Sequence, residues 1–124
     1  MNLEKTVQDM LKAATKAAKG QWKAMSDYAE TEFRRLSAAA IQLEASFALD
    51  MVTAAAQGNA RKRAKLEKTA RERAQLAFEN IELAAAAVVD MSKADLKLAA
   101  QDAVNAALKV LATAINTSLG VPLL

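Results

Sequence analysis

Few side chains in this chain of 124 residues could do chemistry, because it contains neither cysteine nor histidine. Without cysteine there is no disulfide and no thiolate metal ligand, and without histidine there is no imidazole ligand and no Ser–His or Cys–His catalytic pair. No spacing singles out a Lys, Asp or Glu as the activating base of a serine or threonine, and there is no glycine-rich phosphate loop. We therefore expect a non-enzymatic protein with no catalytic residues and no cofactor.

Carboxylates are the metal ligands that remain, and two of them share one expected helix face. Glu79 and Glu82 are spaced i, i+3, and Glu44 lies among apolar residues of an earlier segment. Ferritin-like bundles combine a Glu from each of two helices with a Glu-x-x-His motif from each of two others. Because histidine is absent, we expect these carboxylates to be surface charges and assign no metal. A ferritin-like bundle with a carboxylate-only metal site is the second alternative.

Two aspartates interrupt apolar stretches near expected helix ends. Asp50 lies in Phe-Ala-Leu-Asp-Met-Val, and Asp90 lies in Val-Val-Asp-Met. A buried carboxylate without a cationic partner would be costly. We interpret both as carboxylates at the solvated rim of the contact between two helices. The alternative is a polar contact that sets the helix register or that responds to protonation.

A basic cluster between residues 61 and 73 is the sharpest feature of the sequence. It holds seven basic and two acidic residues, a net charge of +5, whereas residues 24–60 carry −3 and residues 74–124 carry −2. Such a cluster is a candidate patch for an acidic protein or an anionic surface. Nucleic acid is disfavoured, because no aromatic residue interleaves the cluster and no leucine zipper follows it. The members of this basic patch are Arg61, Lys62, Arg63, Lys65, Lys68, Arg71 and Arg73.

Apolar residues recur at helical spacing along the chain and predict an all-α fold. The stripes break near Gly20, at Gly58-Asn59, at Ser92 and at Gly120, where helices are expected to end or to be capped. Ser92 and Asp95 form an S-x-x-D capping pattern for the last helix. The expected helices span residues 3–19, 21–57, 60–90 and 92–119, followed by an apolar tail at 120–124.

Connections this short make neighbouring helices antiparallel. We expect a single domain, residues 1–124, that is an antiparallel four-helix bundle-like fold of three long helices and a shorter N-terminal helix. The N-terminal helix would be the fourth member of the bundle or an arm to a neighbour. About a quarter of the residues are alanine, which predicts close coiled-coil-type packing that buries little area per residue.

Two segments are apolar on more than one side, residues 38–49 and Leu83–Val89. A helix that is apolar most of the way round is buried on most sides. Because three or four helices cannot easily cover both segments, we expect a homo-oligomer. The leading hypothesis is a structural or interaction protein that self-associates through Ala-rich helix faces. The predicted self-association face consists of Leu36, Ala40, Leu43, Phe47, Ile81, Ala84 and Val88.

The chain opens without the apolar core of a signal peptide, and the uncharged run Leu83–Val89 is far shorter than the roughly 20 residues that span a bilayer. We expect a soluble cytoplasmic protein without a transmembrane segment, compatible with association with a virion or granule. In its Ala-rich, Cys-free, amphipathic composition the chain resembles phasins, which coat polyester storage granules, and also small phage and bacterial structural helical proteins. This resemblance implies the alternative of an amphipathic protein bound to a granule or anionic membrane surface.

Overall fold

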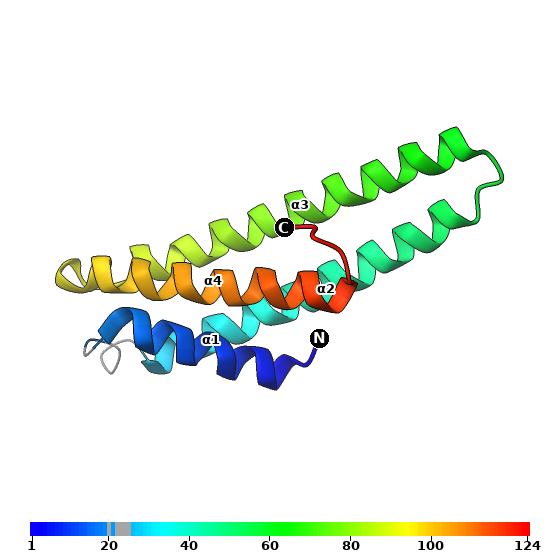
Figure 1. Ribbon diagram of the computed structural model, residues 1–124. Coiled ribbons are helices and arrows are strands. Elements are labelled where there is room, and N and C mark those ends of the chain that lie inside the picture. Colours follow the sequence, from blue (N-terminus) through cyan, green and yellow to red (C-terminus); the bar gives the residue numbers. More distant parts are fainter. Residues whose placement is uncertain (20, 22–25) are drawn as a thin grey trace.

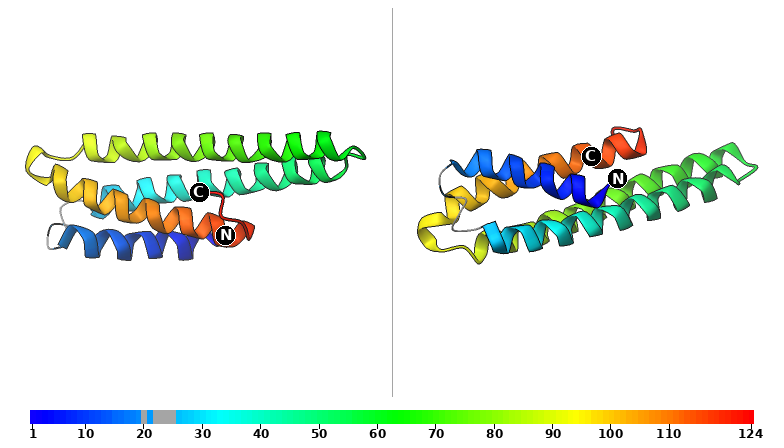
Figure 2. Two further views of the ribbon diagram at one scale, coloured as in Figure 1. Left: turned by 45° about the horizontal axis from the view of Figure 1, so that its top comes forward. Right: turned by 90° about the horizontal axis from the view of Figure 1, so that it is seen from below.

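The computed structural model describes residues 1–19, 21 and 26–124, and these residues form four α-helices (Figure 1). The helices are α1 (Leu3–Ala18), α2 (Ser26–Ala55), α3 (Ala60–Asp90) and α4 (Lys97–Leu119), with a 3-10 turn, η2 (Ala94–Leu96), before α4. Consecutive helices run in opposite directions (Figure 2). The predicted all-α, four-helix bundle-like fold is confirmed.

The bundle consists of two helix pairs, since α1 packs chiefly against α4 and α2 chiefly against α3. α1 also contacts α2, so the N-terminal helix packs on its own bundle. α2 and α3 have 30 and 31 residues, against 16 in α1 and 23 in α4. The α2–α3 hairpin therefore projects beyond the α1–α4 pair (Figure 1). We call residues 50–73 of this projection the hairpin arm.

The C-terminal tail folds back over the end of the four-helix part. The side chain of Asn116 accepts from the backbone N–H groups of Leu123 and Leu124, at 3.0 and 2.9 Å, and Gln75 of α3 donates to the Leu123 carbonyl at 3.3 Å. The Leu123 side chain is buried. The apolar tail thus completes the core at the level where the hairpin arm begins.

Large apolar side chains and alanines together fill the core. Phe33, Met10, Leu111 and Ile115 are fully buried, as are Ala14, Ala40 and Ala85. An alanine gains less from burial than a leucine, but its small size allows two helices to approach closely. The stability of the bundle therefore rests on a few large residues set between small ones.

Local signals explain several of the helix ends. Asn59 is the N-cap of α3, because its side-chain oxygen accepts from the backbone N–H groups of Arg61 and Lys62, and Asn2 caps α1 through Lys5 in the same way. Gly120 ends α4 with φ +69°, a left-handed conformation that glycine adopts without penalty. The predicted break near Gly20 lies outside the described residues, since Gly20 and residues 22–25 are not among them.

The predicted capping role of Ser92 is wrong. Its hydroxyl donates to the Val88 carbonyl at 2.9 Å, so this side chain belongs to the last turn of α3. No side chain caps η2 or α4, and α4 begins at Lys97, later than predicted. A serine hydroxyl near a helix end can bond to the helix before it as well as to the one after it, and here the preceding helix holds it.

Candidate interaction surface on the α2–α3 hairpin

The structure places most of the predicted self-association face inside the chain's own core. The buried members, each exposed by 5% or less, are Leu36, Ala40, Leu43, Phe47, Ile81 and Val88. Ala84 is the exposed member. The strongest apolar stripes of α2 and α3 pack within the chain, so a surface for a second copy has to consist of other residues.

A second apolar stripe on each helix of the hairpin is left uncovered. The exposed fractions are 67% for Leu49, 67% for Val52, 59% for Leu76 and 70% for Leu83. The exposed residues of α2 between 36 and 55 carry no charge; they are Ala38, Ala39, Gln42, Ala45, Ser46, Ala48, Leu49, Val52, Thr53 and Ala55. A helix surface this poor in charge usually contacts another surface.

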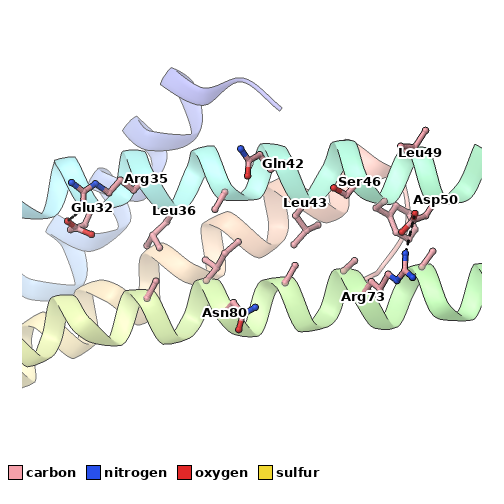
Figure 3. Close-up of a pocket in the computed structure, with 17 residues that line it drawn as sticks. Glu32, Arg35, Leu36, Gln42, Leu43, Ser46, Leu49, Asp50, Arg73 and Asn80 are labelled. Atoms are coloured by element: carbon pink, nitrogen blue, oxygen red, sulfur yellow. Dashed lines mark hydrogen bonds and ion pairs between the residues drawn. The ribbon is translucent and has the colours of Figure 1, made fainter.

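A groove of about 770 Å³ runs between α2 and α3, on the side turned away from α1 and α4, and Leu49 is the member of the uncovered stripes that lines it (Figure 3). Small side chains such as Ala39, Ser46, Ala77 and Ala84 line it, and Gln42 and Asn80 lie near its middle. We call it the outer groove, and the exposed surface around it the outer face of the hairpin. The large side chains that line it, Leu36, Leu43, Phe47 and Ile81, are buried beneath it, and the small exposed ones suit the close approach of another helix.

Each end of the outer groove carries one acidic and one basic side chain. Arg35 and Glu32 form an ion pair at 3.3 Å at one end, and Arg73 and Asp50 form one at 3.8 Å at the other (Figure 3). Asp50 is partly exposed, in agreement with its interpretation as a rim carboxylate, and Asp90 is exposed. The groove therefore has no charged side chain along its middle, and the positive and negative charges at each end neutralise each other.

The basic patch lies on the hairpin arm, and all seven of its members are exposed. Arg73 is engaged by Asp50, and Arg63 donates to the Gln57 carbonyl across the turn at 3.0 Å. Within the described part of the chain, Lys62, Lys65 and Lys68 make no ion pair. These lysines are free to meet acidic groups on another molecule.

The carboxylates considered for a metal site lie apart in the bundle. Glu44 is buried, with one oxygen 3.4 Å from the α-amino group of Met1, and its other oxygen has no hydrogen-bond partner among the described residues. Glu79 and Glu82 are exposed on α3. The described residues bring no three Asp or Glu side chains together as potential metal ligands. The geometry therefore does not favour the ferritin-like alternative.

In the part of the chain that the structure describes, two helical segments, Tyr28–Ala55 and Ala94–Leu119, are long and apolar enough to cross a membrane by length and composition alone. Counting only uncharged runs in the sequence overlooks such windows, because they tolerate one or two charges. Core helices of soluble bundles pass the same test, and these two supply core residues such as Phe33 and Leu111. In each segment only about a third of the window or less is buried, at 28% and 33%, so much of its apolar surface stays uncovered.

The fold and the uncovered face define this chain as an all-α four-helix bundle protein with an extended hairpin. No protein-family model, no curated protein and no solved structure matches it. The outer face and the hairpin arm are therefore the surfaces that bear on its function.

Proposed function

We propose that this protein is a non-enzymatic helical interaction protein that self-associates through the outer face of its α2–α3 hairpin. The observation that carries the proposal is the exposure of Leu49, Leu76 and Leu83, each at 59% or more, beside a stretch of α2 without exposed charge. Monomeric soluble proteins rarely expose contiguous apolar patches of this kind unless they bind something. A second copy would bury the same patch on both chains.

The outer face is large enough for a stable dimer. At 1.5 Å per residue, the 31 residues of α3 are about 46 Å long. Two helices side by side are about 20 Å wide, so the face covers about 900 Å². Stable interfaces bury about 800 Å² on each partner, so the hairpin alone supplies a sufficient area.

A charge placed in the outer groove tests this proposal. Ala84 is exposed and lines the groove, so Ala84→Glu should leave the fold intact and bring a carboxylate into the contact between copies. Ala86 is also exposed, but two residues turn an α-helix by 200°, so Ala86→Glu is the matched control on another side of α3. Ala40 is unsuitable because it is fully buried in the chain's own core.

Light scattering coupled to size exclusion gives the mass of each protein over a range of concentrations. We expect a dimer or larger assembly for the parent protein and for Ala86→Glu, and a monomer for Ala84→Glu at the same concentrations. A monomeric parent protein, or an Ala84→Glu variant with the parent's mass, would contradict the proposal. Circular dichroism checks that both variants remain helical.

A second candidate function is binding to an anionic lipid or granule surface, as the compositional likeness to phasins implies. The observation that favours it is the amphipathic hairpin arm, where the exposed Val52 and Leu66 lie on the same projection as the basic patch. Flotation with vesicles that contain anionic lipid should then recover the protein, less so with 0.5 M salt or with neutral lipid. Absence from the floated fraction in all lipid compositions would exclude this function.

A further inference from the structure

We propose that two copies dock antiparallel through their outer grooves, so that the basic half of α3 in one copy lies along the acidic half of α3 in the other. This inference rests on the proposed self-association and adds its direction and its charge contacts. It identifies the anionic partner of the basic patch as a second copy of this chain.

The first argument is the charge distribution along α3. Its first part, residues 61–73, has a net charge of +5, while residues 74–90 contain no basic residue and three acidic ones, Glu79, Glu82 and Asp90. These three carboxylates are exposed, like the basic residues of the arm. α3 therefore has a positive end and a negative end on its surface, which fits an antiparallel copy of itself.

The second argument concerns the two ways in which identical faces can pack about a two-fold axis. An axis along the helices would make the copies parallel and place two basic arms side by side, which like-charge repulsion disfavours. An axis across the helices, within the contact plane, stacks α2 on α2 and α3 on α3 in opposite directions. The two basic arms then point to opposite ends of the dimer.

The third argument is that the charged residues of α2 and those of α3 require the two-fold axis at the same position along the hairpin. Lys65 and Asp90 are 25 residues apart, which is almost seven whole turns, so they lie on the same side of α3. The midpoint between them is at Ala77 and Phe78. On α2, the midpoint between Arg35 and Asp50 is at Gln42 and Leu43. Ala77, Gln42 and Leu43 all line the outer groove, so one axis brings opposite charges together on both helices.

The middle of the groove fits this axis. Gln42 and Asn80 lie there, and an amide side chain has both donors and an acceptor, so each can pair with an amide of the other copy. At the groove ends, the axis places Arg35 of one copy opposite Asp50 of the other. The contact is therefore uncharged at its centre and complementary at its rim, as in stable protein interfaces.

Distances between spin labels test the direction, and the absence of native cysteine allows single labels. Gly58→Cys places a label at the tip of the hairpin arm, where an added Cβ meets no atom within 4 Å. Asn80→Cys places one near the axis on an exposed site. In the antiparallel dimer we expect about 60 Å between the two Gly58→Cys labels and under about 20 Å between the two Asn80→Cys labels.

The outcomes separate this inference from the proposed function. A dimer whose Gly58→Cys labels are also within about 20 Å would be parallel, which overturns the antiparallel arrangement and leaves self-association intact. A Gly58→Cys protein, which carries its label at the turn and outside the groove, that is monomeric by light scattering overturns both. Binding to vesicles as a monomer would show that a lipid surface, and not a second copy, occupies the outer face.

A charge exchange tests the contacts independently. Lys65→Glu and Asp90→Lys should each raise the dimer Kd by about 3- to 10-fold, since each rim pair occurs twice in the dimer and exposed pairs contribute modestly. The double variant Lys65→Glu/Asp90→Lys should return the Kd to within about 2-fold of the parent, because the charges are exchanged but still paired. A double variant that binds more weakly than either single variant would contradict the pairing.

Discussion

Arg73 on α3 lies 3.8 Å from Asp50 on α2, at the level where the hairpin leaves the support of α1 and α4. The two residues come from sequence segments that looked unrelated, one a basic cluster and the other an apolar stretch. Their pairing links the basic patch to the rim of the outer groove. It also balances the charge at the end of a groove that is otherwise uncharged.

This ion pair should contribute little to the stability of one chain, because Arg73 is 70% exposed and Asp50 30%. We expect Arg73→Gln to lower the free energy of unfolding by about 0.2–1 kcal/mol at low salt and by less in 0.5 M salt. Arg71→Gln, on the same exposed helix, is the control. Urea unfolding of a monomeric background such as Ala84→Glu measures the effect, and a loss above about 2 kcal/mol would mean that the pair is better shielded than this exposure indicates.

Phe33 should be a major stabilising residue, because it is the largest fully buried side chain among the residues that the structure describes. Phe33→Ala should cost about 3–5 kcal/mol, from lost burial and the cavity that remains. Leu98→Ala removes a side chain that is 73% exposed and should change stability by no more than about 0.5 kcal/mol. Urea unfolding followed by circular dichroism compares the two, and equal midpoints would contradict the burial of Phe33.

Helix capping gives a paired comparison between Asn59 and Ser92. Asn59→Ala removes the acceptor for two N–H groups at the start of α3 and should cost about 1 kcal/mol. Ser92→Ala removes a single hydroxyl bond to the Val88 carbonyl, and we expect a loss of less than about 0.5 kcal/mol. The reverse order in thermal unfolding would mean that Ser92 caps the last helix after all.

Tyr28 should titrate above the ordinary tyrosine pKa of about 10. Partial removal from water raises the pKa of Tyr28 and the Glu32 carboxylate raises it further, while Arg35 opposes the rise. Because the pKa of Tyr28 is higher in the folded than in the unfolded protein, the neutral phenol contributes to the stability of the fold. This contribution is complete below pH 10 and is lost as the pH rises through the folded pKa. Tyr28 is the chain's sole tyrosine, so absorbance at the tyrosinate band follows the titration of this residue alone. The titration midpoint should fall when urea unfolds the protein. A higher midpoint in urea would mean that folding lowers the pKa of Tyr28 instead of raising it.

The helices could be predicted from the sequence because their signals are local. The 3.6-residue periodicity, Asn59 and Gly120 mark α3 and α4 without knowledge of the rest of the fold. The choice between the two apolar stripes of α2 is not local. Leu36 and Phe47 on one stripe and Leu49 and Val52 on the other are similar in hydrophobicity, and only packing against α3 and α1 decides that the first stripe is buried.

The outer groove could be predicted only in part for the same reason. The excess of apolar residues at 38–49 and Leu83–Val89 correctly indicated surface left uncovered by a single chain, and exposed residues from both segments now form it. The positions of Asp50 and Arg73 relative to each other depend on the length of the turn at Gly58 and on the register of the two helices. Sequence spacing within one helix does not contain that information.

The unequal lengths of the helix pairs also divide the molecule dynamically. In the four-helix part, opening a segment exposes Phe33, Met10 and Leu111, whereas in the hairpin arm it exposes little more than Ala54 and Ala70. Local opening costs least where few apolar contacts are lost. The amide hydrogens of the arm should therefore exchange with solvent through fraying from the Gly58 turn, well before those of the body. A second copy on the outer face would slow this exchange, so the arm would acquire its full rigidity only on assembly.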